Sequence, residues 1–274
     1  VELAKKEKAD GVMATDPDSD RFGTAFPDKD GNFVLLSGNQ MGALLIDYIL
    51  RSRKELGKMP ANPAIIRSIV TSPFGDYICK KYGVKMIECL TGFKWIAAVE
   101  ANFEKDNSAS YVFGLEESYG YKVETEVMDK DGVSAAAMCA EMILYWRSQG
   151  KSLLEHLDDL YKEFGYFEDR AISQNFPGAS GSETMKAMMS SMRANPPKTL
   201  GGEKVVKVRD CLADPELPKS NVLQFYLESG TIVSARPSGT EPKIKFYINS
   251  MIPAGHRCFG FLPVPSVDVL ASRE

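Results

Sequence analysis

The residues of this chain best placed to do chemistry are three aspartates at alternate positions, Asp16, Asp18 and Asp20, followed directly by Arg21. In an extended or looped backbone, alternate side chains project to the same side, so the three carboxylates can converge on one point. Anions held this close repel one another unless a cation lies between them, and oxygen-only ligands suit a hard divalent ion. We therefore predict a Mg²⁺ site, because Mg²⁺ is the usual ion where phosphates share the site.

The position of this Asp loop, residues 16–21, supports the prediction. It begins one residue after a short apolar run at 11–14, and ligands gather at the carboxyl ends of strands in open α/β sheets. A solvated acidic turn is the alternative, which Pro17 and the aspartates also favour. An EF-hand fits poorly, because Arg21 stands where that loop needs Gly and Pro27 stands where it needs Glu.

A second loop, residues 114–121, follows directly on a predicted strand and carries Glu116 and Ser118. These two side chains could hydrogen-bond adjacent hydroxyls of a sugar, since each hydroxyl both donates and accepts. A polar loop with a solvated pair of glutamates fits the same spacing equally well.

A third loop lies between two predicted strands and contains Arg236, Ser238, Gly239 and Thr240. It offers a guanidinium fork, two hydroxyls and a glycine whose backbone N–H can be approached closely, a set that matches a phosphate dianion. It is not a Walker loop, because the pattern G-x-x-x-x-G-K-[ST] is absent from the sequence. The alternative is a connection between strands that proline and glycine merely stiffen.

A fourth segment, Thr91-Gly92-Phe93-Lys94, opens a predicted helix. Helix N-termini attract anions and Lys94 adds positive charge. Thr-Gly before a helix is also common capping chemistry, so this segment alone favours neither interpretation.

The elements that must position these loops are predicted from hydrophobic periodicity. Residues 1–57 predict a helix, a strand, the Asp loop, an Asp-Gly hairpin around 28–31 and a helix over 39–56. Over residues 64–150 strands alternate with helices, which favours a parallel sheet covered on both faces. The methionines and alanines of the last helix there, 133–146, indicate core packing rather than a cofactor site.

After an amphipathic helix over 152–164 the pattern changes. A helix over 182–192 lies among several strands, which indicates a smaller α+β domain on an antiparallel sheet. The predicted fold class is therefore α/β, with mixed or parallel-sheet domains followed by that α+β domain. Strands are predicted near residues 171–176, 204–209, 222–227, 231–235 and 243–248. The predicted domains are residues 1–59, 60–165 and 166–274.

Composition excludes several classes of protein. The chain has 274 residues and a net charge of −4, with no basic block that would indicate a nucleic-acid or membrane partner. Its apolar runs are too short to span a bilayer. The five scattered cysteines predict reduced thiols, mostly in the core, and hence a cytoplasmic protein. Only His156 and His256 are present, which excludes mechanisms built on several histidines, and we expect His156 to be structural.

Together the four loops resemble the α-D-phosphohexomutase family, which comprises phosphoglucomutases, phosphomannomutases and their relatives. The resemblance covers roughly residues 1–249, and the family's motifs occur in the order metal loop, Thr91-Gly92-Phe93-Lys94 loop, sugar loop and phosphate loop. The form Gly-Leu-Glu-Glu-Ser-Tyr-Gly-Tyr at 114–121 looks most like the bacterial phosphoglucomutase branch.

The resemblance implies a mechanism in which a phosphoserine converts a hexose 1-phosphate into a bisphosphate, which turns around and returns its other phosphate. The implied ligands are glucose 1-phosphate, glucose 6-phosphate and glucose 1,6-bisphosphate. Asp16, Asp18 and Asp20 would hold Mg²⁺, and Arg21 would position the transferring group. The resemblance also implies two sets of binding residues. The sugar would be bound by Thr91, Gly92, Lys94, Glu116 and Ser118, and the unreactive phosphate by Arg236, Ser238, Gly239 and Thr240.

The sequence departs from the family at both ends. No phosphoserine loop of the Ser-His-Asn type occurs, and Val1 opens a predicted helix already under way, as in a chain that starts mid-protein. Residues 250–274 carry prolines at 253, 263 and 265 instead of a charged amphipathic helix. We expect a fragment that lacks the N-terminal phosphoserine domain and is inactive alone.

Three alternatives stay open at this point. The preferred one is a phosphoglucomutase fragment, and within the enzyme class the alternative is a phosphomannomutase or a dual-specificity mutase. The alternative from another class is a non-catalytic module that binds sugar phosphates.

Overall fold

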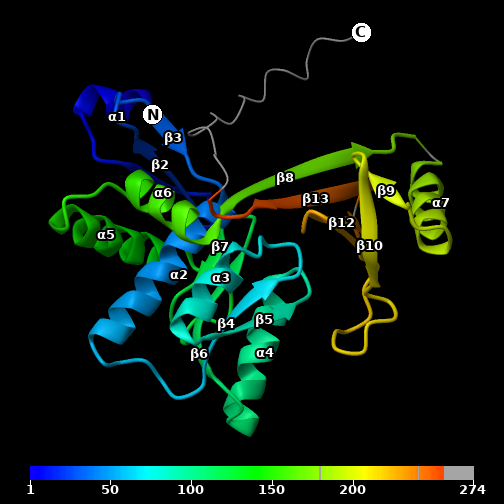
Figure 1. Ribbon diagram of the computed structural model, residues 1–274, viewed down its shortest axis with the longest axis horizontal. Helices are drawn as coiled ribbons and strands as arrows, with labels where there is room; N and C mark the ends of the chain where they lie inside the picture. The colour runs from blue at the N-terminus through cyan, green and yellow to red at the C-terminus, as the bar shows by residue number, and fades with distance from the viewer. Residues whose placement is uncertain (179, 240, 256–274) are drawn as a thin grey trace.

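The computed structural model describes residues 1–178, 180–239 and 241–255, and within them the strands form three sheets (Figure 1). The first sheet is antiparallel, with the order β1–β2–β3. The Asp loop joins β1 to β2, and the predicted Asp-Gly hairpin joins β2 to β3. The elements of this part are α1 (Glu2–Glu7), β1 (Val12–Thr15), β2 (Phe22–Pro27) and β3 (Phe33–Leu35).

The second sheet has the order β5–β4–β6–β7. Strand β4 pairs in parallel with β5 and β6, and the short β7 pairs antiparallel with β6. Its strands are β4 (Pro63–Ser68), β5 (Lys85–Cys89), β6 (Ser110–Glu116) and β7 (Gly120–Lys122). The helices of this part are α2 (Gly38–Glu55), α3 (Phe74–Tyr82), α4 (Phe93–Asp106), α5 (Gly132–Ser148) and α6 (Leu153–Phe164).

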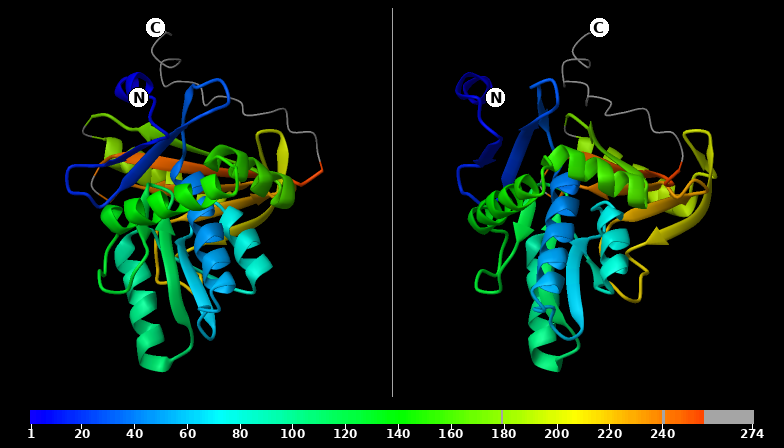
Figure 2. Two further views of the ribbon diagram at one scale, coloured as in Figure 1. Left: turned by 90° about the vertical axis from the view of Figure 1, so that its left-hand side faces the viewer. Right: turned by 60° about the vertical axis from the view of Figure 1, so that its left-hand side comes forward.

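Helices cover both faces of this second sheet, as predicted. Because side chains alternate along a strand, Ile65 and Phe113 join the core formed with α2, α3, α5 and α6, whereas Ala64 and Ile66 face α4. In the ribbon α4 lies on the other side of β4 and β6 from α2 (Figure 1). Helix α1 and the first sheet lie at the end of the molecule opposite to α4 (Figure 2).

Local sequence signals explain where several helices begin and end. Helices α2 and α6 each begin with a capping box, formed by Ser37 with Gln40 and by Ser152 with Glu155. Gly83 ends α3 in the left-handed region, with a φ of 70° that side-chain-bearing residues adopt at a cost.

The third sheet is antiparallel throughout, with the order β8–β13–β12–β11–β10–β9. Helix α7 packs on one of its faces through Met185 and Met189, which contact Phe225, Ala235 and Ile244. The elements are β8 (Tyr166–Asn175), α7 (Gly181–Ala194), β9 (Thr199–Leu200), β10 (Glu203–Asp210), β11 (Leu223–Leu227), β12 (Ile232–Pro237) and β13 (Lys243–Ile252). The predicted α+β domain on an antiparallel sheet is confirmed.

The structure differs from the predicted elements at a few places. Strands β7 and β9 were not predicted, because three and two residues are too short to show a periodicity. Strand β8 begins at Tyr166, earlier than the predicted residue 171. The domain boundary at residue 59 stays a prediction, although α2, which precedes it, shares its core with the second sheet.

The predicted core positions of the cysteines and the structural role of His156 agree with the described residues. Cys79, Cys89, Cys139 and Cys211 are buried free thiols. His156 is buried, and its Nε2 lies 2.9 Å from Oδ2 of Asp47, which is a structural contact between α6 and α2. Cys258 and His256 lie outside the described residues. None of the helices in the described ranges combines the length and apolar character that crossing a membrane requires.

Candidate functional site

The Asp loop folds so that its three carboxylates converge. One oxygen from each of Asp16, Asp18 and Asp20 lies within 4.8 Å of the other two. Ser19 adopts a φ of 59° and donates its N–H to the Asp16 carbonyl at 3.0 Å, which turns the chain back on itself. The Arg21 N–H donates to Asp16 Oδ1 at 3.1 Å, and this bond lowers the pKa of the Asp16 carboxyl.

The donor set of this loop fits a hard divalent cation. All three ligand atoms are carboxylate oxygens. Within the described residues Asp20 Oδ1 is buried and makes no hydrogen bond, although a buried carboxylate oxygen normally has a partner. A cation between the aspartates would supply that partner.

A positive charge lies beside the Asp loop, on the ammonium group of Lys130. Its Nζ lies 2.5 Å from Asp20 Oδ2. Burial by itself would lower the pKa of Lys130, but its contacts with Asp20 and Asp129 outweigh burial and raise it. Lys130 lies just before α5, where Gly132 donates its N–H to the Ser19 carbonyl at 3.0 Å. A Cβ on Gly132 would lie 2.7 Å from that oxygen, so this close approach requires glycine.

The turn between β6 and β7, residues 117–119, joins three of the predicted loops. Arg21 pairs with Gly120 as an isolated antiparallel bridge, and Phe22 donates its N–H to the Tyr119 carbonyl at 3.0 Å. On the other side Gly92 donates its N–H to Glu116 Oε1 at 2.5 Å. The Asp loop and the 91–94 segment therefore flank the predicted sugar loop directly.

The two glutamates of the sugar loop are held by uncharged donors. Glu116 is 6% exposed, which contradicts the solvated-pair alternative for this residue. Glu117 Oε2 accepts from the hydroxyls of Ser68 at 3.2 Å and Thr71 at 3.3 Å, and both hydroxyl-bearing residues are buried. Burial raises the pKa of both glutamates, and the positive charge of Arg236 offsets part of that rise. Ser118, the next residue along the chain, is partly exposed.

Part of the 91–94 segment contacts the sugar loop, through the N–H of Gly92. Gly92 has a φ of 117° and precedes α4, and no side chain caps this helix, which argues against the capping alternative. Thr91 Oγ1 is buried and makes no hydrogen bond within the described part of the chain. Lys94 is exposed, with its Nζ 5.3 Å from the centroid of the Trp95 ring.

The predicted phosphate loop is the hairpin between β12 and β13. Ser238 donates its N–H to the Lys243 carbonyl at 2.8 Å, and its Oγ accepts from the Glu241 N–H at 3.3 Å. Arg236, near the end of β12, pairs with Lys245 of β13. Its positive charge acts on Glu116 and Glu117, which lie on the sugar loop of the second sheet, and offsets part of the rise in their pKa values that burial causes. Gly239 is exposed, and Thr240 lies outside the described residues.

Comparison with known proteins agrees with this arrangement of loops. Residues 37–164 match the family model described as phosphoglucomutase/phosphomannomutase, alpha/beta/alpha domain III. The phosphoglucomutase of Staphylococcus aureus strain USA300 is 35% identical over 265 residues, which cover 92% of this chain and 47% of that protein. Residues 37–164 belong to the phosphoglucomutase/phosphomannomutase family, and the similarity to its members extends over 92% of the chain. The chain spans about half the length of the curated relatives it matches.

Solved structures of phosphohexomutases share the fold. The open form of Paramecium parafusin, a phosphoglucomutase, superimposes with a TM-score of 0.65 and 18% identity, over 92% of this chain and 42% of that one. The N-acetylphosphoglucosamine mutase of Aspergillus fumigatus, in complex with GlcNAc-6P and magnesium, gives a TM-score of 0.52 and 14% identity, over 91% and 48%. At these identities the likeness concerns the fold alone.

The sequence alone did not indicate three residues of the site. Lys130 lies more than a hundred residues from Asp20, and Ser68 and Thr71 lie more than forty residues from Glu117. The signal that could have found Ser68 and Thr71 is their position at the carboxyl end of β4, the middle of the three parallel strands. We find no comparable signal for Lys130.

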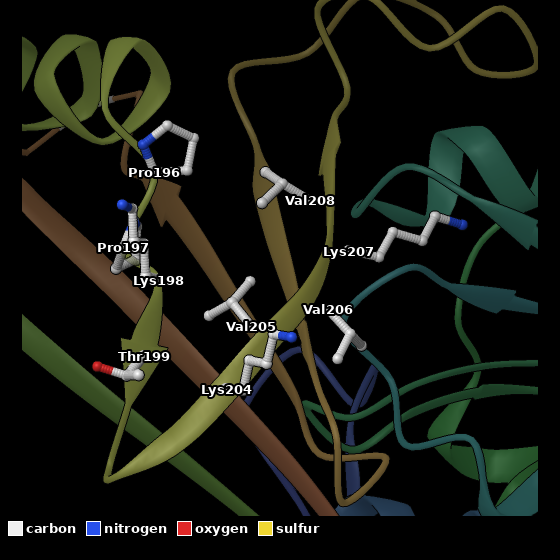
Figure 3. A pocket seen from close by; sticks show the side chains of 9 residues that line it. All are labelled: Pro196, Pro197, Lys198, Thr199, Lys204, Val205, Val206, Lys207 and Val208. Atoms are coloured by element: carbon white, nitrogen blue, oxygen red, sulfur yellow. The ribbon is translucent and has the colours of Figure 1, made fainter.

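A pocket of about 430 Å³ lies elsewhere, between β10 and the segment 196–199 (Figure 3). Its side chains are mainly prolines, lysines and valines, and Figure 3 shows them on two facing segments. It contains none of the predicted site residues, so we do not assign the candidate site to it.

Proposed function

We propose that the chain is part of a phosphohexomutase that interconverts glucose 1-phosphate and glucose 6-phosphate through a phosphoserine and glucose 1,6-bisphosphate. The activity is that of the whole protein, since the chain spans about half of its relatives. The phosphoglucomutase name of the S. aureus relative supports the glucose preference. The observation that carries the proposal is that the Asp loop and the 91–94 segment flank the loop bearing Glu116 and Glu117, on which the charge of Arg236 also acts.

In this proposal the Asp loop holds Mg²⁺ through Asp16, Asp18 and Asp20. The ion, when bound, would neutralise charge that develops during phosphoryl transfer. The magnesium complex of the Aspergillus mutase supports the choice of metal. Arg21, whose backbone is fixed by its bridge to Gly120, would position the transferring group with its guanidinium.

The remaining loops would hold the sugar phosphate. Glu116 and Ser118 would accept and donate hydrogen bonds to sugar hydroxyls, and Thr91, Gly92 and Lys94 would line the same side. The unreactive phosphate would lie at Arg236, Ser238, Gly239 and Thr240. The Aspergillus complex with GlcNAc-6P supports hexose phosphates as the ligand class. Lys130, beside Asp20, adds a positive charge that an anionic ligand would favour.

The nucleophilic serine is not among the motifs of this chain, because the sequence contains no Ser-His-Asn loop. The residues present can bind a sugar phosphate but have no assigned group that accepts the phosphoryl. We therefore propose that the chain alone binds hexose phosphates without turnover.

The proposed domains are residues 1–59 with the metal loop, 60–165 with the sugar loop and 166–274 with the phosphate loop. The buried free cysteines support a cytoplasmic location.

Calorimetric titration with glucose 1,6-bisphosphate, with and without Mg²⁺, tests the proposal. We expect saturable binding that Arg236→Ala weakens about tenfold or more, because a charge-assisted hydrogen bond to phosphate is lost. Arg147→Ala is the matched control, since it removes an exposed guanidinium from the end of α5. Absence of binding by the folded wild-type chain, or an equal loss in both variants, would contradict the proposed site.

A further inference from the structure

The third sheet presents one apolar and one polar face. Side chains alternate along antiparallel strands, so Phe225 and Ala235 lie on the face that α7 covers. The opposite face carries a polar row that includes Gln224 of β11 and, on the adjacent strand β12, its register partner Ser234 and Arg236 two residues further on. This polar face contacts the end of the second sheet, and Arg236, near the end of β12, is close enough for its charge to act on Glu116 and Glu117.

Two buried amides on this polar face contact one short loop of the second sheet. Gln224 Nε2 donates to the Ile69 carbonyl at 2.9 Å, and Asn249 Nδ2 donates to the Val70 carbonyl at 3.2 Å. Gln224 is 1% exposed and Asn249 is 5% exposed. Two amides from different strands therefore bind two successive carbonyls at the carboxyl end of β4. Buried amide groups require such partners, which makes the register of this contact specific.

The loop that receives these amides, residues 68–71, is itself held rigidly. Arg67 is buried and donates from Nη1 to the carbonyls of Ser68 at 3.2 Å and Thr71 at 3.3 Å. Its guanidinium is neutralised by Asp76, at 2.7 Å, and by Glu88, at 2.9 Å. Arg67 therefore holds the first and last carbonyls of the 68–71 loop, and the two amides of the third sheet bind the two carbonyls between them.

The same loop holds the sugar side of the candidate site. The hydroxyls of Ser68 and Thr71 bind the Glu117 carboxylate. On the third sheet, Gln224 Nε2 also donates to Ser234 Oγ at 3.0 Å, and Ser234 is two residues before Arg236 on the same face of β12. Hydrogen bonds therefore link Glu117 to the 68–71 loop, that loop to Gln224, and Gln224 to β12, the strand that carries Arg236.

We propose that Gln224 and Asn249 are positioning residues, which dock the third sheet on the 68–71 loop and so set Arg236 opposite Glu116 and Glu117. The inference rests on the proposed function, since it is the sugar phosphate that has to span Arg236 and the sugar loop. Neither amide contacts the ligand. A role confined to general stability is the simpler alternative, and it leaves the position of the third sheet in the folded chain unchanged.

Trp95 offers a signal of docking that needs no ligand. It packs against the apolar cluster that Ile69, Val70 and Leu90 form with Cys211 and Tyr247 of the C-terminal part. The chain has two tryptophans, so Trp146→Phe, in the α5 core, leaves Trp95 as the only tryptophan, whose emission can be excited selectively at wavelengths that tyrosine does not absorb. In that background Gln224→Leu and Asn249→Leu each leave a loop carbonyl buried without its donor, which favours separation of the two sheets.

We expect each variant to show a red-shifted Trp95 emission and stronger quenching by iodide, at a temperature where circular dichroism shows it folded. In the same samples the affinity for glucose 1,6-bisphosphate should fall about tenfold. Thr231→Val is the matched control, because it removes a buried hydroxyl just before β12, whose partners in the described residues are Ser229 and Ser250. It should change neither signal.

The two arms separate failure of the inference from failure of the proposed function. Unchanged Trp95 emission and quenching in both amide variants would overturn the inference, whatever happens to affinity. Variants that change Trp95 but keep wild-type affinity would also overturn it, because docking would then not position Arg236. Should the wild-type chain bind no bisphosphate, the proposed function fails for this chain, and the Trp95 signal alone decides whether the amides dock the sheet.

Discussion

The aspartates of the Asp loop and the glutamates of the β6–β7 turn lie on neighbouring segments, yet their carboxylates are held in opposite ways. Asp16, Asp18 and Asp20 converge within 4.8 Å at the surface, and a backbone N–H lowers the pKa of Asp16. Glu116 and Glu117 instead receive a backbone N–H and two buried hydroxyls, and burial raises the pKa of both.

This difference shows that the surroundings of a carboxylate, rather than its residue type, decide which role it can take. In the Asp loop negative charge is concentrated and one buried oxygen of Asp20 has no partner, so a cation is the missing component. Glu116 Oε1 and Glu117 Oε2 instead accept hydrogen bonds from neutral donors. An environment of this kind suits hydrogen bonding to sugar hydroxyls. Three causes separate the two clusters, namely desolvation, nearby charge and hydrogen bonding.

The largest effect expected from this comparison concerns Mg²⁺. The double variant Asp16→Asn/Asp18→Asn should bind Mg²⁺ more than about tenfold more weakly, because two of the three anionic ligands are neutralised. The charge-matched control is Glu116→Gln/Glu117→Gln, which removes the same charge from the neighbouring turn and should change the affinity much less. Calorimetry at constant ionic strength measures both. An equal loss in the two variants would mean that the aspartates act only through net charge.

A smaller effect of opposite sign is expected at Lys130. Its ammonium occupies Asp20 Oδ2 at 2.5 Å and so competes with a cation for that oxygen. Lys130→Met should therefore strengthen Mg²⁺ binding by about threefold to tenfold. Lys94→Met removes the same charge from an exposed position nearby and serves as the control. Weaker Mg²⁺ binding in Lys130→Met would show that the lysine orients Asp20 instead of competing for it.

The fold was predictable wherever a local pattern was long or chemically distinctive. The helix expected over 39–56 is α2, and the helix expected over 182–192 is α7. The Asp-Gly hairpin forms because Gly31 adopts a φ of 81° and Asp28 binds the following backbone N–H groups. Strands of two or three residues gave no pattern, so β7 and β9 were missed.

The candidate site was predictable only loop by loop. Spacing alone indicated that the carboxylates of the Asp loop converge, because alternate positions share one side of the chain. Which loops meet depends on contacts between distant segments, such as Gly92 with Glu116 and Arg21 with Gly120. Thr71 follows the carboxyl end of β4, and only this position, with no motif beside it, could have indicated that its hydroxyl binds Glu117. Its role follows from the order of strands in the sheet and not from any motif.

The smallest expected effect concerns the free energy of unfolding, whose dependence on pH should differ between the glutamate and the aspartate clusters. Burial raises the pKa of Glu117 above its ordinary value of 4.5, so the folded chain keeps this proton to a higher pH than the unfolded chain. The resulting stabilisation is present below pH 4.5 and is lost as the pH rises through the folded pKa. In Glu117→Gln, urea denaturation should therefore show a free energy of unfolding that falls less steeply with pH above 4.5 than in the wild type.

Asp16 should behave in the opposite sense, because its pKa is lowered from 3.8. Its stabilisation is present above pH 3.8 and is lost as the pH falls through the folded pKa, so Asp16→Asn should flatten the acid side of the same curve. The change should be slight, since Asp16 is at the surface and solvent screens its interactions. If both substitutions flattened the curve on the same side, the two clusters would share one environment, and the assignment of a cation to one and a sugar to the other would lose its physical basis.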